Sequence, residues 1–481
     1  MYLNFNREIL MSYLRGFSCF LLSLFFFAGN PADVQSQTNF QLISSFDGPS
    51  GSQPYSTLVE DSSGVLYGTT FSGGSNTTRG TVFRVMKDGG DFRVLRHFAS
   101  GAGGSRPPAG VIEASDGALY GVTGTGGSNG PNGTIFKLNK DGSGYTAFWH
   151  FTGTVADGRQ PQTGLIEGRD GFLYGTTFGA GASVPGSVFK IRKDGTGFSV
   201  LHLFEGTGDG MLPWGTLLEG SDDAIYGTTY SGTTGSSIFG TIFKVSKDGS
   251  GYQILRYCSV ANGAYPYGGL IETIDGALYG TTTRGGSADN YGTVFKINKD
   301  GTGHKVIFVF SGTDGAQPRG TLAEGTGGVL YGATFSGGNS TNGTVFRFNK
   351  DGSGYTVLHR FADDGSDGRG PAAGVLVAKD GAIYGTTAFG GNANLGTIFK
   401  LSAPAPNLVV LSIAKSMSNA QLNLNGGIPG IVYRIQATTN LSLPNGWSVL
   451  GPMEAGLEGV LQFLDTNTSV YPARFYRSVT P

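Results

Sequence analysis

The chain has 481 residues, of which 84 are glycine, 38% are hydrophobic, 12% are aromatic and 14% are charged, with 33 basic against 34 acidic residues. This length predicts more than one domain, and the aromatic content argues against a disordered glycine-rich tract. The near-zero net charge, without a basic stripe in any segment, argues against nucleic acid or an anionic membrane surface as a partner.

Residues 1–36 have the pattern of a secretory signal peptide. Arg7 and Arg15 precede an apolar run, 16–28, that is short for a membrane span, and cleavage is expected before Gln37. An uncleaved anchor is the alternative. We therefore expect export to the extracellular space, the cell surface or the periplasm. Cleavage would leave Cys258 as the single cysteine of the mature chain, so no intramolecular disulfide is expected.

The next part of the chain is a tandem repeat. Seven copies of Leu-Tyr-Gly-Thr-Thr or a close variant follow one another at intervals of 52 to 54 residues, with their tyrosines at Tyr67, Tyr120, Tyr174, Tyr226, Tyr279, Tyr331 and Tyr384. Such a regular period indicates one supersecondary unit repeated around or along an axis.

Each repeat contains four segments that have the composition of β-strands and are bounded by glycine, aspartate or proline. We call them a, b, c and d, and in the first copy they span residues 55–60, 65–71, 80–86 and 92–98. Helical periodicity is absent throughout. The repeat therefore predicts an all-β fold with four antiparallel strands per unit.

Two kinds of connection alternate in the repeat. The a–b turns are usually Asp-Gly, as at Asp116-Gly117, and the c–d turns are usually Lys-Asp-Gly, as at Lys140. The b–c and d–a loops are longer and differ between copies. Because antiparallel strands alternate in direction, one face of the fold carries the standard turns and the other the varied loops. We call them the turn face and the loop face, and we expect function on the loop face.

The strand count predicts a closed ring. The last repeat has segments a, b and c but no d, whereas residues 39–46 resemble a d segment that comes before any a segment. Residues 37–401 are therefore predicted to form a seven-bladed β-propeller closed by an N-terminal strand, which leaves no exposed sheet edge. Residues 402–407 are predicted to be an Ala/Pro linker, and residues 408–481, with six short strand segments, a small β-sandwich. No terminal hydrophobic helix follows, so we expect no membrane insertion of the mature chain.

The unit "LYGTT…GG…GTVFK…KDGSGY…L…F", complete at 119–151 and 278–310, resembles the Gloeo_Verruco (GloVer) tandem repeat of secreted bacterial proteins. The resemblance covers residues 39–401. It implies an exported, propeller-like protein of undetermined biochemical role, and it carries over no catalytic residue. The pattern departs from the family at Val122 and at Asp223, which replaces a turn glycine.

A proline opens each a segment, and the residue after it varies between copies. We expect these residues to surround the mouth of the central channel on the loop face. The candidate ligand-binding residues are Tyr55, Gln162, Trp214, Tyr267 and Arg319, with Pro108 and Ala372 completing the ring. Aromatic and polar groups together suit stacking on a sugar or a peptide group. Packing at the rim without a ligand is the alternative.

Six of the seven a segments end in glutamate, and the seventh ends in Val377. The two interpretations are a cation-binding ring of carboxylates and, preferred here, six structural groups that pair with a nearby base or turn. The glutamates are Glu60, Glu113, Glu167, Glu219, Glu272 and Glu324.

No catalytic constellation is apparent. The five histidines all fall in d segments, at a repeat position, and no nucleophile motif accompanies them. The acidic run 363–368 resembles a calcium loop but lacks the glutamate of an EF-hand, so we expect no cofactor or metal, with calcium as the alternative.

Three hypotheses for function follow. The first is an exported binding module for a carbohydrate, another surface polymer or a surface protein. The second is a polysaccharide-active enzyme, a glycosidase or lyase, with its site in the channel. The third is a structural protein of the cell envelope.

Overall fold

A computed structural model describes residues 39–75, 79–179, 186–206, 208–232, 239–362 and 367–402, together with six strands between residues 409 and 479. The predicted signal peptide, the linker residues 403–407 and residues 363–366 of the acidic run lie outside this part. None of the described residues forms a helix long and apolar enough to span a membrane.

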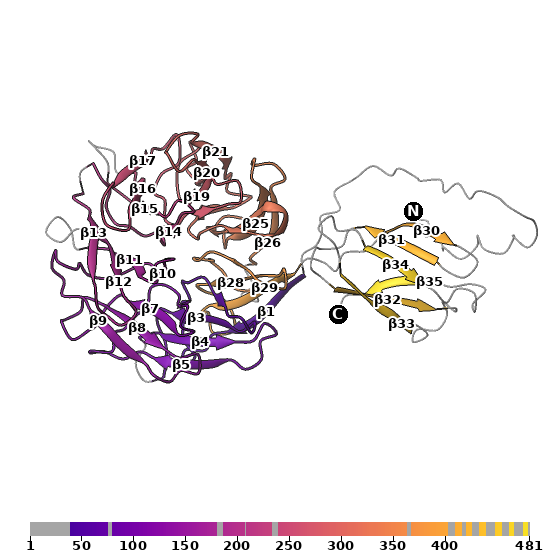
Figure 1. Cartoon of the computed structure of the whole chain (residues 1–481), viewed down its shortest axis with the longest axis horizontal. Coiled ribbons are helices and arrows are strands. Elements are labelled where there is room, and N and C mark those ends of the chain that lie inside the picture. Colours follow the sequence, from indigo (N-terminus) through magenta and orange to yellow (C-terminus); the bar gives the residue numbers. More distant parts are fainter. Residues whose placement is uncertain are drawn as a thin grey trace, which may run out of the picture. The chain divides into compact units, whose positions relative to one another are not determined.

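Each repeat folds into an antiparallel sheet, and the seven sheets follow one another around a propeller, as Figure 1 shows from indigo to orange. The innermost strands, a, are β2 (Val59–Glu60), β6 (Ile112–Glu113), β10 (Ile166–Glu167), β14 (Leu218–Glu219), β18 (Ile271–Glu272), β23 (Ala323–Glu324) and β27 (Leu376–Val377). The b strands are β3 (Leu66–Thr70), β7 (Leu119–Thr123), β11 (Leu173–Thr177), β15 (Ile225–Thr229), β19 (Leu278–Thr282), β24 (Val329–Ser336) and β28 (Ile383–Thr387).

The c strands are β4 (Thr81–Val85), β8 (Thr134–Leu138), β12 (Ser187–Ile191), β16 (Thr241–Val245), β20 (Thr293–Ile297), β25 (Thr344–Asn349) and β29 (Thr397–Ser402). The outermost strands, d, are β5 (Arg93–His97), β9 (Thr146–His150), β13 (Ser199–Leu203), β17 (Gln253–Tyr257), β21 (Lys305–Val309), β26 (Thr356–Arg360) and β1 (Asn39–Ser45). We number the blades 1 to 7 in the order of their b strands.

The apolar core lies between neighbouring blades. The cluster around Val82 and Phe98 of blade 1, for example, also contains Leu119 and Phe136 of blade 2. The central glycine of each b strand makes room for this packing, since a Cβ on Gly68 would lie 2.5 Å from Phe83 Cζ. Burying an apolar face on both sides of every sheet requires neighbours on both sides, which a closed ring supplies.

Blade 7 is closed by the N-terminal strand, as predicted. Strand β1 pairs antiparallel with β29, and Asn39 lies opposite Ser402. The contact between blades 7 and 1 is built like the others. A Cβ on Gly396 would lie 2.6 Å from Pro54 Cδ, just as one on Gly80 would lie 2.7 Å from Pro107 Cδ. Strand order and contacts together confirm the predicted seven-bladed ring.

The structure differs from the prediction in the length of the a strands. Residues 55–60 were expected to form a strand, but only Val59–Glu60 pairs with β3. The preceding residues run along the central channel, where side-chain hydroxyls replace the backbone ladder. Thr69 Oγ1 donates to the carbonyl of Ala109 in the next blade at 2.8 Å, and lies 3.0 Å from Ser56 Oγ.

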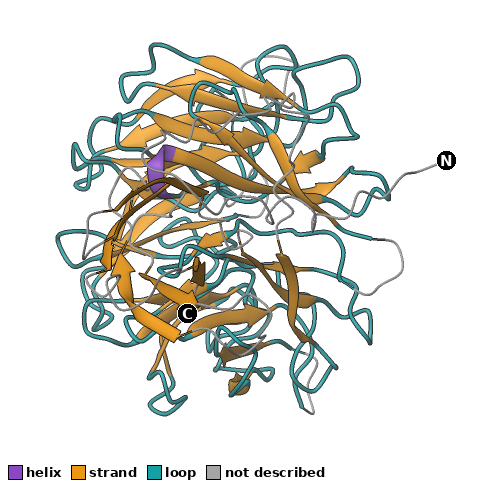
Figure 2. Cartoon of the chain, turned by 90° about the vertical axis from the view of Figure 1, so that its right-hand side faces the viewer, coloured by secondary structure: helices purple, strands orange, loops and turns teal. Residues whose placement is uncertain are grey.

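Blades 4 and 6 depart from the standard turns. Asp223 takes the place of the turn glycine in blade 4 and adopts its positive φ, 68°. In blade 6 a 3-10 turn, η1 (Thr326–Gly328), replaces the Asp-Gly turn, and an extra short strand, β22 (Ala316–Pro318), pairs with β24. This turn is the one helical element of the described residues, drawn in purple in Figure 2.

The described strands of the C-terminal region form two three-stranded antiparallel sheets, as expected for a small β-sandwich. One sheet has the order β30-β31-β34 and the other the order β33-β32-β35. Their bounds are β30 (Val409–Lys415), β31 (Ala420–Asn425), β32 (Val432–Thr438), β33 (Ser448–Glu454), β34 (Leu461–Asp465) and β35 (Phe475–Val479).

Candidate functional site

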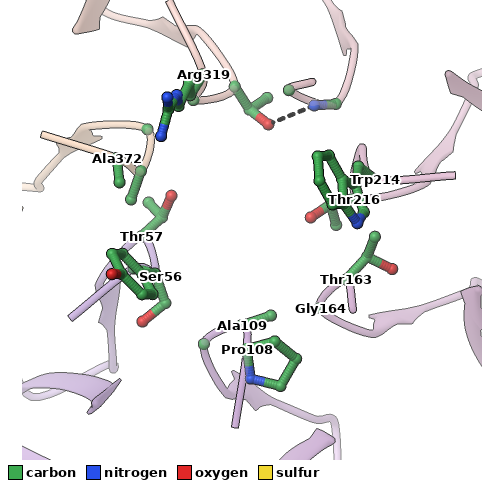
Figure 3. A pocket seen from close by; sticks show the side chains of 18 of the residues that line it. Ser56, Thr57, Pro108, Ala109, Thr163, Gly164, Trp214, Thr216, Arg319 and Ala372 are labelled. Carbon is green, nitrogen blue, oxygen red and sulfur yellow. Dashed lines mark hydrogen bonds between the residues drawn. The ribbon is translucent and has the colours of Figure 1, made fainter. Parts of the chain in front are cut away.

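A cavity of about 520 Å³ occupies the centre of the propeller, and residues from all seven blades line it. Figure 3 shows these residues around an open centre, among them Thr57, Pro108, Thr163, Trp214 and Arg319. The volume falls in the range of small-molecule sites. We call its opening on the loop face, where the prolines begin the a segments, the mouth.

The five predicted site residues all line this cavity, and four of them form one group. The rings of Trp214 and Tyr267 have centroids 4.5 Å apart, and the Arg319 guanidinium lies 5.9 Å from the centre of the Tyr267 ring. Tyr55 lies close enough to Arg319 that the guanidinium charge partly offsets the effect of burial, which raises the pKa of the Tyr55 phenol. Gln162 lines the cavity in blade 3, next to blade 4 that carries Trp214.

A second set of aromatic residues, which was not predicted from the sequence, lies next to the first. Phe71 and Phe335 directly follow Gly-Thr-Thr or its variant in the b strands, Phe389 comes one residue later, and all three line the cavity. Tyr230 packs against Trp214 with ring centroids 4.9 Å apart. The signal was present in the sequence, because the position after Gly-Thr-Thr varies between copies just as the position after the proline does.

Arg319 is the one charged side chain among the described residues that line the cavity. Its guanidinium lies 3.5 Å from the centre of the Phe335 ring, and its Nη2 is 3.4 Å from Gln317 Oε1. Burial lowers the pKa of Arg319 and raises those of Tyr267 and Tyr55. A guanidinium stays protonated despite such a shift, and both phenols stay neutral near pH 7.

The backbone at the mouth is held by bonds between blades. The residue before each opening proline has a positive φ, between 53° and 64°, which residues other than glycine rarely adopt. This conformation lets its N–H donate to a carbonyl of the preceding blade, as from Gln160 to Asn132 at 2.6 Å. Its own carbonyl accepts from the residue after Gly-Thr-Thr, as from Phe178 at 3.1 Å. The two aromatic sets are therefore fixed to one rigid framework.

The six glutamates on the turn face are structural, as preferred from the sequence. Each pairs with the lysine of the Lys-Asp-Gly turn in its own blade, at Nζ–Oε1 distances of 2.5 to 2.7 Å. Several also accept a backbone N–H from a neighbouring blade, as Glu272 does from Ser221 at 2.7 Å. Blade 7 takes its d strand from β1 and so has no c–d turn, which explains why Val377 replaces the glutamate there.

The histidines are dispersed in the outer strands. His202 and His359 bond to Asp209 and Asp367 of their own blades at 3.1 and 2.7 Å. No group of three or more histidine, cysteine, aspartate or glutamate side chains within the described ranges could hold a metal ion. Of the acidic run, for which calcium was the alternative, Asp363 and Asp364 lie outside those ranges, while Asp367 is hydrogen-bonded to His359.

Solved structures with a similar course of the chain belong to several kinds of protein. An oligogalacturonate lyase in complex with manganese has 9% identity and a TM-score of 0.49, and covers 77% of this chain and 95% of its own. A putative 6-phosphogluconolactonase from Bacteroides uniformis has 13% identity and a TM-score of 0.45, over 81% and 96%. A fungal alcohol oxidase in complex with copper has 12% identity and a TM-score of 0.44, over 92% and 99%. No curated protein sequence matches significantly.

The family comparison is more direct. A model of the Gloeobacter/Verrucomicrobia repeat matches three overlapping regions, residues 32–234, 132–328 and 287–428, which together span the whole propeller. This confirms the resemblance seen in the repeated sequence unit. The chain belongs to the Gloeobacter/Verrucomicrobia repeat family.

Proposed function

We propose that this protein is an exported binding module that recognises a carbohydrate at the mouth of the propeller. The observation that carries the proposal is the cavity of about 520 Å³ with Trp214, Tyr267, Tyr55 and Arg319 gathered on its wall. Aromatic faces stack on the apolar faces of sugar rings, while an arginine and hydroxyl groups bond to the sugar's oxygens.

The rigidity of the mouth supports binding. Six strained backbone positions, with Gly370 at the seventh, and the bonds between blades hold the aromatic side chains before any ligand arrives. A preformed site loses less conformational entropy on binding than a flexible one, and so retains more of its contact energy as affinity. The half-buried state of Trp214 and Tyr267 leaves part of each ring available to a ligand.

The lining fits binding better than hydrolysis. A glycosidase uses two carboxylates that flank the scissile bond, and the described lining residues include none. A lyase that used tyrosine as a base would need a phenol with a lowered pKa, whereas burial raises the pKa of both Tyr55 and Tyr267.

The test is a glycan-array screen of the full chain, with calcium and again with chelator, together with a Trp214→Ala variant. We expect binding to a defined set of glycans and a loss of affinity of at least about tenfold in the variant. Trp149 packs against Phe198 in the outer part of blade 2, so Trp149→Phe is the matched control and should bind normally.

Absence of binding to every glycan would overturn the proposal and favour the structural role or a protein partner. Binding that survives Trp214→Ala unchanged would place the site elsewhere. Loss of binding with chelator would revive the calcium interpretation of the acidic run.

A further inference from the structure

Arginine is concentrated at the mouth, and the aspartates nearest to it in the sequence, Asp157 and Asp367, are bonded to Thr152 and His359 rather than to an arginine. Each blade has six inner mouth positions. Four are the opening proline, the two residues before it and the one after it. The other two are the residues that follow Gly-Thr-Thr or its variant. These positions contain no aspartate, glutamate or lysine, and their arginines are Arg106, Arg159, Arg284, Arg319 and Arg369.

Most of these arginines lie over aromatic rings of the same mouth. The guanidinium of Arg106 is 5.7 Å from the centre of Phe71, and that of Arg369 is 5.5 Å from the centre of Phe389, whereas Arg319 lies closer to Phe335. All three rings line the cavity. The positive groups are thus placed around the cavity wall itself. A guanidinium stacked on a ring has five N–H donors around its edge, so those that do not bond to the protein can bond to a ligand.

The charge of these arginines is not neutralised by the protein. Within the described ranges none of the five takes part in an ion pair. The side chains of Arg319 and Arg369 donate to neutral amides, Gln317 Oε1 at 3.4 Å and Asn394 Oδ1 at 3.2 Å. Arg319 is partly buried in this state, and burying a cation without a counter-charge is unfavourable. The charged side chains at the inner mouth positions are therefore all positive, in a chain whose net charge is −1.

We propose that the ligand of the mouth is an acidic saccharide, whose carboxylate or sulfate group is bound by Arg319 while its ring stacks on Trp214 and Tyr267. This inference rests on the proposed carbohydrate binding and names the class of saccharide. A planar guanidinium donates two parallel bonds to such an oxyanion, and the incoming anion supplies the missing counter-charge. Arg106 and Arg369, on other blades around the opening, would bind acidic groups of further sugar units.

The test compares two ligands with the same β-1,4-linked backbone, a mannuronate hexamer and mannohexaose, by calorimetric titration of the full chain. A sulfated mannohexaose forms a third arm that separates carboxylate from sulfate. We expect at least one acidic form to bind at least about tenfold more tightly than the neutral sugar, with a marked decrease at higher salt. The tighter of the two acidic forms identifies the oxyanion.

Variants assign the effect to the mouth. Arg319→Gln should lower the affinity for the acidic sugar by at least about tenfold, and Arg319→Lys should restore part of it. The exposed Arg106→Gln should lower it less, and it tests the mouth even if Arg319→Gln folds poorly. Arg192 provides the matched control. It lies in a c–d turn of the turn face and stacks on Phe172, and Arg192→Gln should bind the acidic sugar normally.

Two outcomes would overturn the acidic class while leaving carbohydrate binding intact. One is equal affinity for the neutral and acidic sugars, with both affinities lost in Trp214→Ala. The other is selective binding of neutral glycans. If Arg192→Gln and Arg319→Gln lowered the affinity for the acidic sugar equally, the attraction would depend on the overall charge of the protein. That result would also overturn the assignment of the site to the mouth. Failure of every glycan on the array would overturn both proposals together.

Discussion

The two faces of this propeller use charged side chains in opposite ways. On the turn face, six glutamates and six lysines occur at equivalent positions, and every pair is closed at 2.5 to 2.7 Å. On the loop face, five arginines occupy four different repeat positions of the mouth, and none of them makes an ion pair among the described residues. Charge that the fold satisfies internally stabilises the fold, and charge that it leaves unsatisfied is available to a ligand.

The comparison therefore separates stability from recognition. Changes on the turn face should alter the free energy of unfolding and leave ligand binding intact, whereas changes at the mouth should do the reverse. Substitutions and changes of pH on each face test this division.

The largest effect is expected from Glu272→Ala. The substitution removes the partner of Lys299, at 2.6 Å, and the acceptor of the Ser221 N–H. The Glu272 side chain is 12% exposed, so the unpaired lysine and N–H are only partly rescued by water. We expect the free energy of unfolding to fall by about 2 kcal/mol, measured by urea denaturation. Glycan binding should not change, and a variant that lost binding without losing stability would contradict the division.

A second prediction concerns the stability of the fold at low pH. Burial acts to raise the pKa of Asp61 and Asp116, but hydrogen bonds outweigh it and lower both to about 2, chiefly from Ser63 to Asp61 and from Lys137 to Asp116. Their ordinary value is 3.8, so the unfolded chain binds protons more readily than the folded one. The stabilisation is complete above about pH 4 and is lost as the pH falls towards 2.

Denaturation midpoints between pH 6 and pH 2 would measure this loss, and Asp116→Asn should reduce it. Burial also acts to raise the pKa values of Glu167 and Glu272, but hydrogen bonds, chiefly from Lys193 and Lys299, outweigh it and lower both, which adds to the same trend. A midpoint that stayed constant down to about pH 2 would show that the turn-face carboxylates contribute little to stability.

The smallest effect is expected at the mouth over the neutral range. Arg319 remains protonated, and burial raises the pKa of Tyr55 and Tyr267 away from neutrality. Affinity for the mannuronate hexamer should therefore change little between about pH 6 and pH 8, as measured by calorimetry. A steep change in this range would indicate a titrating group outside the set described above, and would weaken the assignment to Arg319.

The fold was predictable because the same pattern of strands and turns occurs seven times in the sequence. One copy of the unit could be misread, but the tyrosines from Tyr67 to Tyr384 fix the period, and the d-like segment 39–46 fixes the closure. The a strands were predicted too long because strand composition does not distinguish a hydrogen-bonded strand from a channel wall. Ser56 and Thr69 satisfy each other through hydroxyl groups there, and no sequence period records such a bond.

Only part of the candidate site could be predicted from the sequence. Tyr55, Trp214, Tyr267 and Arg319 were found because they vary beside an invariant proline. Their partners Phe71, Phe335 and Tyr230 lie on other segments, and only the folded blade brings the two sets together. The unpaired state of the arginines was also beyond prediction, because the sequence contains almost equal numbers of acidic and basic residues and does not show which of them meet.

The closure of blade 7 has a mechanical consequence. Because Asn39 lies opposite Ser402, strands β1 and β29 leave the ring at the same end of their pairing. A force applied between the segment before β1 and the segment after β29 would peel the pair apart one hydrogen bond at a time. A force that enters through a ligand at the mouth and leaves through the C-terminal region would instead pull β29 along its own axis, between β28 and β1. The hydrogen bonds of both pairings would then share the load, so the ring resists this second force better than the first.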